Sequence, residues 1–112
     1  MTPKDFVACL RREVLEANLT LYRQNLGRSS PALAEPQTLW PKMTELYQSL
    51  TEEQRRQFME GIRQVMVDTL SNVLGILDGS TMLEHHRGYF HLTYDDELRE
   101  LNGELQDLFL SH

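Results

Sequence analysis

The chain has few of the features that would place it outside the cell or in a membrane. Cys9 is the only cysteine in 112 residues, so no disulfide can form within the chain, and its apolar neighbours favour a buried thiol over a reactive one. No apolar run approaches the about 20 residues that span a bilayer, which excludes a transmembrane helix. Residues 1–14 lack the continuous apolar block of a secretory signal. We therefore expect a cytoplasmic protein.

Patterns that carry catalytic chemistry are also missing. No serine lies in a glycine-rich nucleophile elbow, and no glycine loop has the spacing that cradles a phosphate. The residues that come nearest to a metal-binding set are Glu84, His85, His86 and His91. Their spacing matches no recognised ligand pattern, and adjacent histidines in a turn seldom converge on one ion. We expect no enzymatic activity, no metal site and no cofactor.

Negative charge dominates, and it is concentrated toward the C-terminus. The formal net charge is −6 at pH 7. Residues 84–112 carry seven acids against two arginines, whereas residues 1–28 carry five cations against three acids. Because phosphate neutralisation drives nucleic-acid affinity, an acidic chain without a basic stripe is a poor candidate for binding DNA or RNA. The acidic segment suits a cationic protein partner; the alternative is that it only keeps a small protein soluble.

The segment from Thr51 to Asp78 predicts one long central helix. Residues 51–54 (TEEQ) fit a capping box, in which the threonine hydroxyl and the glutamine side chain satisfy unpaired amides reciprocally. Apolar side chains and one threonine cover roughly half of the circumference: Phe58, Ile62, Val65, Met66, Val67, Thr69, Leu70, Val73, Leu74, Ile76 and Leu77. The remaining polar strip consists of Glu60, Gln64, Asp68, Ser71 and Gly75. We expect the rest of the chain to enclose this helix and a close approach at the glycine.

An earlier helix is predicted to start at Thr2 and Pro3. Projection at about 100° per residue gathers one core-facing seam, which consists of Phe6, Leu10, Val14, Ala17 and Leu21. A second stripe lies opposite the seam in the later half of the helix and consists of Leu15, Leu19, Tyr22 and Leu26. Either the chain itself or a partner covers this second stripe. Cover within the chain is favoured, because the chain turns back after Gly27.

The remaining segments are shorter. Residues 27–36 (GRSSPALAEP) predict a loop, and a short helix follows from Pro41. Residues 81–84 and 89–94 are rich in β-formers and are separated by four turn residues, which predicts a β-hairpin. Residues 101–110 predict a final short helix that starts near Asn102. The predicted fold is a mainly α single domain, residues 1–112, around one long helix, with a short β-hairpin before a C-terminal helix.

Two stretches resemble small acidic bacterial immunity proteins, which neutralise polymorphic toxins. They are VDTLSNVLGILDG at residues 67–79 and LNGELQDLFL at residues 101–110. The resemblance includes no motif with an assigned role, so it identifies no site residue. What it implies is a mechanism in which a compact domain binds its cognate toxin, often over the active site, and is itself no enzyme. The acid-rich C-terminal region is compatible with that mechanism, since toxins that act on nucleic acids or nucleotides commonly have cationic clefts.

We therefore expect a non-enzymatic intracellular binding protein whose acidic C-terminal surface meets a cationic toxin domain. The expected partner-binding residues are Tyr89, Tyr94, Asp95, Asp96, Glu97 and Glu100. Tyrosines supply contact area at low conformational cost, and carboxylates steer association. The alternative is a homo-oligomeric helical adaptor or structural module that associates through the second stripe of the first helix, as a dimer that Leu19→Asp would dissociate.

Overall fold

The computed structural model describes residues 1–28 and 39–111, and over these residues the protein is mainly helical. The elements are α1 (Pro3–Leu10), a π-helical segment η1 (Arg11–Glu16), α2 (Ala17–Leu26), α3 (Leu39–Ser49), α4 (Glu52–Asp78) and α5 (Leu105–Leu110). The loop predicted for residues 27–36 lies outside the described residues except at Gly27 and Arg28. None of the described helices combines the length and the apolar character that crossing a bilayer requires.

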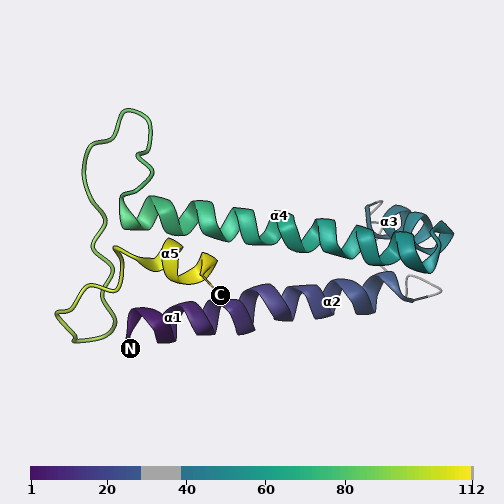
Figure 1. Ribbon diagram of the computed structural model, residues 1–112, viewed down its shortest axis with the longest axis horizontal. Helices are drawn as coiled ribbons and strands as arrows, with labels where there is room; N and C mark the ends of the chain where they lie inside the picture. Colours follow the sequence, from purple (N-terminus) through teal and green to yellow (C-terminus); the bar gives the residue numbers. More distant parts are fainter. Residues whose placement is uncertain (29–38, 112) are drawn as a thin grey trace.

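Two long antiparallel helical paths form the body of the molecule. Figure 1 shows α1, η1 and α2 as one continuous path, with α4 running back beside it. At one end α3 packs against α2, and at the other α5 lies between α1 and α4 and contacts both. The core joins α1, η1, α2, α4 and α5 and consists of Val7, Leu15, Leu19, Leu26, Met59, Leu74, Leu105 and Phe109; side chains of α3 pack against it. The connection between α4 and α5 lies at the end of the molecule where the N-terminus is found (Figure 1).

The predicted start of the long helix is confirmed. The Thr51 hydroxyl accepts a hydrogen bond from the Gln54 amide at 3.2 Å, and the Gln54 side chain accepts one from the Thr51 amide at 3.0 Å. The helix ends at Gly79, whose φ of 83° is left-handed and therefore favours glycine. Thr2 caps α1 in the same reciprocal way with Asp5, and hydrogen bonds from the Thr2 side chain and backbone lower the pKa of the Asp5 carboxyl.

In the later half of the first helical path, the second stripe is buried, whereas the seam that was predicted to face the core is exposed. Leu15, Leu19 and Leu26 are the buried residues there, whereas Val14 and Leu21 are exposed. At about 100° per residue, Leu15 lies about 80° round the axis from Val7. A π segment accommodates an extra residue and turns the following residues back by a similar angle. The segment η1 therefore brings the later stripe onto the face of the buried Val7.

The prediction that the chain itself covers the second stripe is thus confirmed. Leu19 is fully buried, at 0% exposure, and Tyr22 packs against the core and edge-on against Trp40 with ring centroids 5.0 Å apart. A homodimer through this stripe would require the core to open. The structure offers no free surface there for the adaptor alternative.

The expectation that the rest of the chain encloses α4 is wrong for part of the helix. Val65 and Val73 are 65% and 50% exposed, whereas Ser71 and Gly75 of the predicted polar strip are buried. The reason is the position of α5, whose Gln106 side chain lies over the strip and donates to both oxygens of Ser71 at 3.0 and 3.1 Å. A polar side chain thus covers the end of the strip at Ser71 and Gly75, whereas Glu60, Gln64 and Asp68 remain exposed.

Gly75 permits the close approach that the sequence predicts, and the group that approaches it is the Gln106 side chain. Alanine substitutions at the two glycines of α4 should therefore distinguish the effect of this packing from the effect of helix propensity. A Cβ at Gly75 would lie 2.9 Å from the Gln106 Nε2, whereas one at Gly61 would meet nothing within 4 Å. Gly61→Ala should stabilise the protein by about 0.5–1 kcal/mol. Gly75→Ala should be about 1–2 kcal/mol less stable than Gly61→Ala, because it displaces the amide from Ser71. Urea unfolding of the two variants measures the difference, and equal stabilisation by both would contradict the close packing at Gly75.

The predicted β-hairpin is wrong, since no strand is present in the described part of the chain. Residues 89–94 do not pair with residues 81–84. Instead the Leu92 carbonyl accepts from the Leu101 amide at 2.7 Å, and the Leu92 amide donates to the Asn102 side chain at 2.9 Å. The backbone hydrogen bond between Leu92 and Leu101 and the side chain of Asn102 thus replace the hydrogen bonds that a second strand would have made. The final helix begins at Leu105 and not near Asn102, because that asparagine is used to hold the connecting segment.

Candidate functional site

The connecting segment, residues 79–104, is the most distinctive surface of the molecule. Six of its large apolar side chains are exposed: Met82, Leu83, Tyr89, Phe90, Tyr94 and Leu98. Ordinary surfaces carry such residues singly, and a concentration of them marks an interaction or ligand-binding region. The segment is therefore the candidate functional site.

Asn102 fixes the middle of the connecting segment to α4. Its side-chain amide donates to the carbonyl oxygens of Leu77 at 2.6 Å and of Phe90 at 2.8 Å, while its oxygen accepts from the Leu92 amide. Three of the four hydrogen-bonding positions of the asparagine are thereby used on backbone groups. A long loop without regular structure is held in one conformation by this residue.

Asp78 fixes the end of the connecting segment. Its carboxylate accepts from three backbone amides, those of Gly103 at 2.6 Å, Leu105 at 3.1 Å and Gln106 at 2.7 Å. These amides lie at the N-terminus of α5, where amides lack partners within the helix and favour a negative charge. The last residue of α4 therefore serves as the cap of α5.

All six predicted partner-binding residues are exposed and lie on this segment: Tyr89, Tyr94, Asp95, Asp96, Glu97 and Glu100. Two of the acids have partners within the chain. Glu97 pairs with the N-terminal ammonium of Met1 at 3.1 Å, and Glu100 pairs with His91. The two tyrosines line different cavities, Tyr89 beside the end of α4 and Tyr94 beside α1. The structure thus places the predicted residues on one segment but does not gather them into a single cluster.

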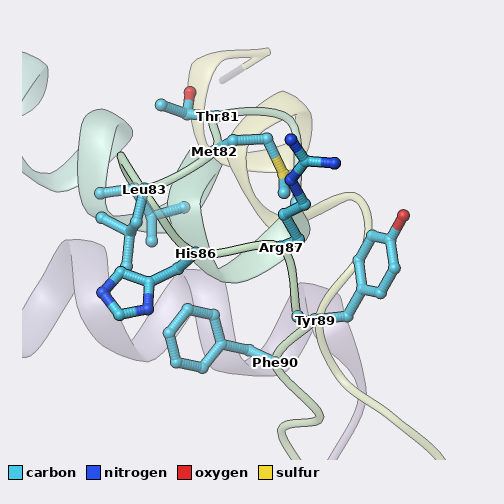
Figure 2. A pocket seen from close by; sticks show the side chains of 10 residues that line it. Thr81, Met82, Leu83, His86, Arg87, Tyr89 and Phe90 are labelled. Carbon is cyan, nitrogen blue, oxygen red and sulfur yellow. The ribbon is translucent and has the colours of Figure 1, made fainter.

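An open apolar cavity of about 410 Å³ lies where the connecting segment leaves α4. Its walls include Ile76 from the last turn of α4 and Met82, Leu83, Tyr89 and Phe90 from the segment. Figure 2 shows Leu83, His86 and Phe90 to one side of the view, with Met82, Arg87 and Tyr89 to the other. The volume falls in the range of small-ligand sites. Sequence reasoning missed this cavity, because the hairpin it assumed would have placed these side chains on opposite faces.

The arginines of α4 form a second feature that sequence reasoning missed. Arg55, Arg56 and Arg63 line an open cavity between α2, α3 and α4 together with Arg23. Arg55 donates to the Tyr47 and Gln48 carbonyls at the end of α3, and Arg63 pairs with Glu16 at 2.7 Å. Hydrogen bonding to Glu53 raises the pKa of Arg56. Arg55 and Arg63 therefore join α4 to its neighbours, Arg56 pairs within α4, and we assign these three side chains no ligand.

The four candidate metal ligands, Glu84, His85, His86 and His91, do not converge on one point in the structure. His85 pairs with Glu84 at 3.3 Å, His91 pairs with Glu100, and His86 lines the apolar cavity. Within residues 1–28 and 39–111, no three His, Cys, Asp or Glu side chains gather closely enough to hold a metal ion. Cys9 is half-buried and accepts a contact from Arg12 at 3.5 Å.

Comparison with known proteins adds no assignment to this geometry. No protein-family model matches the chain, and no curated protein or solved structure matches it significantly.

Proposed function

We propose that this chain is a non-enzymatic binding protein, an immunity protein that neutralises a cognate bacterial toxin through its acidic C-terminal surface. One observation carries the proposal: the connecting segment displays exposed tyrosines and acids while Asn102 and Asp78 anchor its backbone. An anchored segment loses little conformational freedom on binding, so more of its contact energy is available as affinity.

The charge of the segment suits a basic partner. The acids Asp95, Asp96 and Glu97 follow one another and are all exposed. Such groups steer an oppositely charged protein into place and mainly raise the association rate. Tyr94 stands directly beside them at 50% exposure and supplies apolar contact area.

The partner is identified by affinity capture from the native host followed by mass spectrometry. We expect a cationic protein that arrests growth when produced alone and fails to do so when this chain is produced with it. Retention of this chain alone, or of a protein whose toxicity this chain leaves unchanged, would contradict the proposal.

Charge reversal then tests the surface. Replacing Asp95, Asp96 and Glu97 by lysine raises the net charge by six, from −6 to 0, and should weaken the complex at least tenfold, mainly through slower association. A control with the same change in net charge replaces three exposed acids on α3 and α4, Glu45, Glu52 and Asp68. The control should lose less than about threefold, since charges farther than a Debye length from the interface are screened. Surface plasmon resonance measures both rates, and equal losses in the two variants would remove this surface from the proposal.

A further inference from the structure

The apolar cavity at the end of α4 has one permanently charged side chain, Arg87, in its otherwise mainly apolar lining. A ligand with an apolar part and a negative charge would match both features. We propose that the cavity binds a small amphipathic anion, a carboxylate attached to an apolar chain. The chain would lie against Ile76, Leu83 and Phe90, and the carboxylate would meet Arg87. This inference goes beyond the proposed function, because it requires no toxin and concerns a site that the isolated protein already presents.

Arg87 has no acidic partner among the residues that the structure describes. It is the only lysine or arginine between Arg63 and Arg99. The nearest acid in sequence, Glu84, pairs with His85 at 3.3 Å, and the Asp78 carboxylate is taken by the amides of α5. Among the described residues, the Arg87 guanidinium makes no ion pair and no hydrogen bond. A planar guanidinium beside an apolar cavity is suited to a carboxylate, which it binds through two parallel hydrogen bonds.

The walls of the cavity are held by backbone contacts, so the site exists before a ligand arrives. The Thr81 amide donates to the Gly75 carbonyl at 3.1 Å, and the His86 amide donates to the Leu83 carbonyl at 3.1 Å. The left-handed Gly79 turns the chain so that the Tyr89 ring lies close to it. Pre-formed apolar pockets with one or two placed polar groups are typical of small-ligand sites.

The size of the cavity limits the ligand. About 410 Å³ accommodates a chain of about eight carbons with its head group. Ten heavy atoms, at an efficiency per atom between those of drug-sized and of very small ligands, correspond to a dissociation constant on the order of 0.1–1 mM. Octanoate is therefore a suitable probe, and 1-octanol and octylammonium share its chain with a neutral and a positive head.

Comparison of the three probes distinguishes binding at the proposed site from non-specific attraction of a ligand to the protein. The protein carries a net charge of −6, so non-specific charge effects favour octylammonium. We expect octanoate to bind at least tenfold more tightly than octylammonium and several-fold more tightly than octanol in NMR titrations up to 10 mM. Shifts should be confined to residues 76–90. Absence of octanoate binding, a preference for octylammonium, or shifts centred on another surface would each overturn the proposal.

Variants of exposed residues test the two halves of the site without disturbing the core. Arg87→Gln should weaken octanoate about tenfold and leave octanol unchanged, whereas the control Arg99→Gln, on the same segment, should change neither. Phe90→Ser should weaken both probes, whereas Leu98→Ser, at a side chain 96% exposed and outside the cavity, should weaken neither. Equal octanoate affinity in Arg87→Gln and Arg99→Gln would overturn the role of Arg87.

Discussion

Replacing Phe109 with alanine is expected to lower the free energy of unfolding by about 3–5 kcal/mol, the usual cost of removing a buried phenyl ring. The ring is 1% exposed and belongs to the core between α1, α4 and α5. The Arg11 guanidinium lies 4.6 Å from the ring centroid, and it also donates to the Phe109 carbonyl. The substitution therefore removes apolar burial and a cation–π contact together. Urea unfolding followed by circular dichroism measures the loss.

The neighbouring residue provides the control for Phe109. Leu110 follows in the same short helix and is 53% exposed. Leu110→Ala keeps helix propensity similar and should cost less than about 1 kcal/mol. Similar stabilities of the two variants would mean that α5 does not dock through Phe109 in solution.

The helix boundaries at Thr2, Thr51 and Gly79 were predictable from the sequence because short-range hydrogen bonds and backbone conformation determine them. The capping box at Thr51 and the glycine at position 79 act within a few residues, and the structure has both. The cap at Thr2 is of the same kind. Local chemistry of this sort can be read without knowledge of the tertiary fold.

The buried faces were less predictable, because they depend on departures from ideal geometry and on distant residues. The π segment Arg11–Glu16 moves the later half of the first helix to another face, and no residue type in it signals this change. The burial of Ser71 depends on Gln106, which lies 35 residues away. A periodic projection of one helix contains neither kind of information.

The hairpin was mispredicted because β-forming composition does not decide pairing. Residues 89–94 contain the residue types of a strand, yet the Phe90 carbonyl and both backbone groups of Leu92 bond to Asn102 and Leu101. Composition reports which side chains suit a half-buried surface, and the partner of the segment is set by tertiary context. The predicted tyrosines and acids are exposed, whereas the cavity depends on the path of the segment, which composition does not give.

Residues 67–79 and 101–110, on which the expected resemblance to immunity proteins rests, pack against each other in the structure. Ser71, Gly75 and Asp78 of residues 67–79 contact Gly103 and Gln106 of residues 101–110. These residues join α4 to α5 and do not form the candidate site. Their structural role explains why the resemblance, by itself, identifies no binding residue.

Replacing Asp78 with alanine is expected to cost about 2–4 kcal/mol, although the side chain carries no apolar burial. The carboxylate accepts from three amides at the start of α5, and hydrogen bonds to charged groups are worth about 1.5–3 kcal/mol each when removed singly. A helix of six residues is too short to be stable without such a cap. Asp78→Asn keeps one acceptor oxygen and should lose about half as much. Thermal and urea unfolding measure both variants.

Asp68→Ala is the matched control for Asp78, since it removes an acid from the same helix. The Asp68 carboxylate is exposed and accepts one hydrogen bond, from the Gln64 side chain at 2.9 Å, so the change should cost less than about 0.5 kcal/mol. Loss of the Asp78 cap should also allow α5 to detach before the rest of the protein unfolds. The backbone amide of Gln106 should then exchange its hydrogen faster than the backbone amides of α4. An Asp78→Ala protein as stable as the control would show that Leu105 and Phe109 hold α5 in place without the cap.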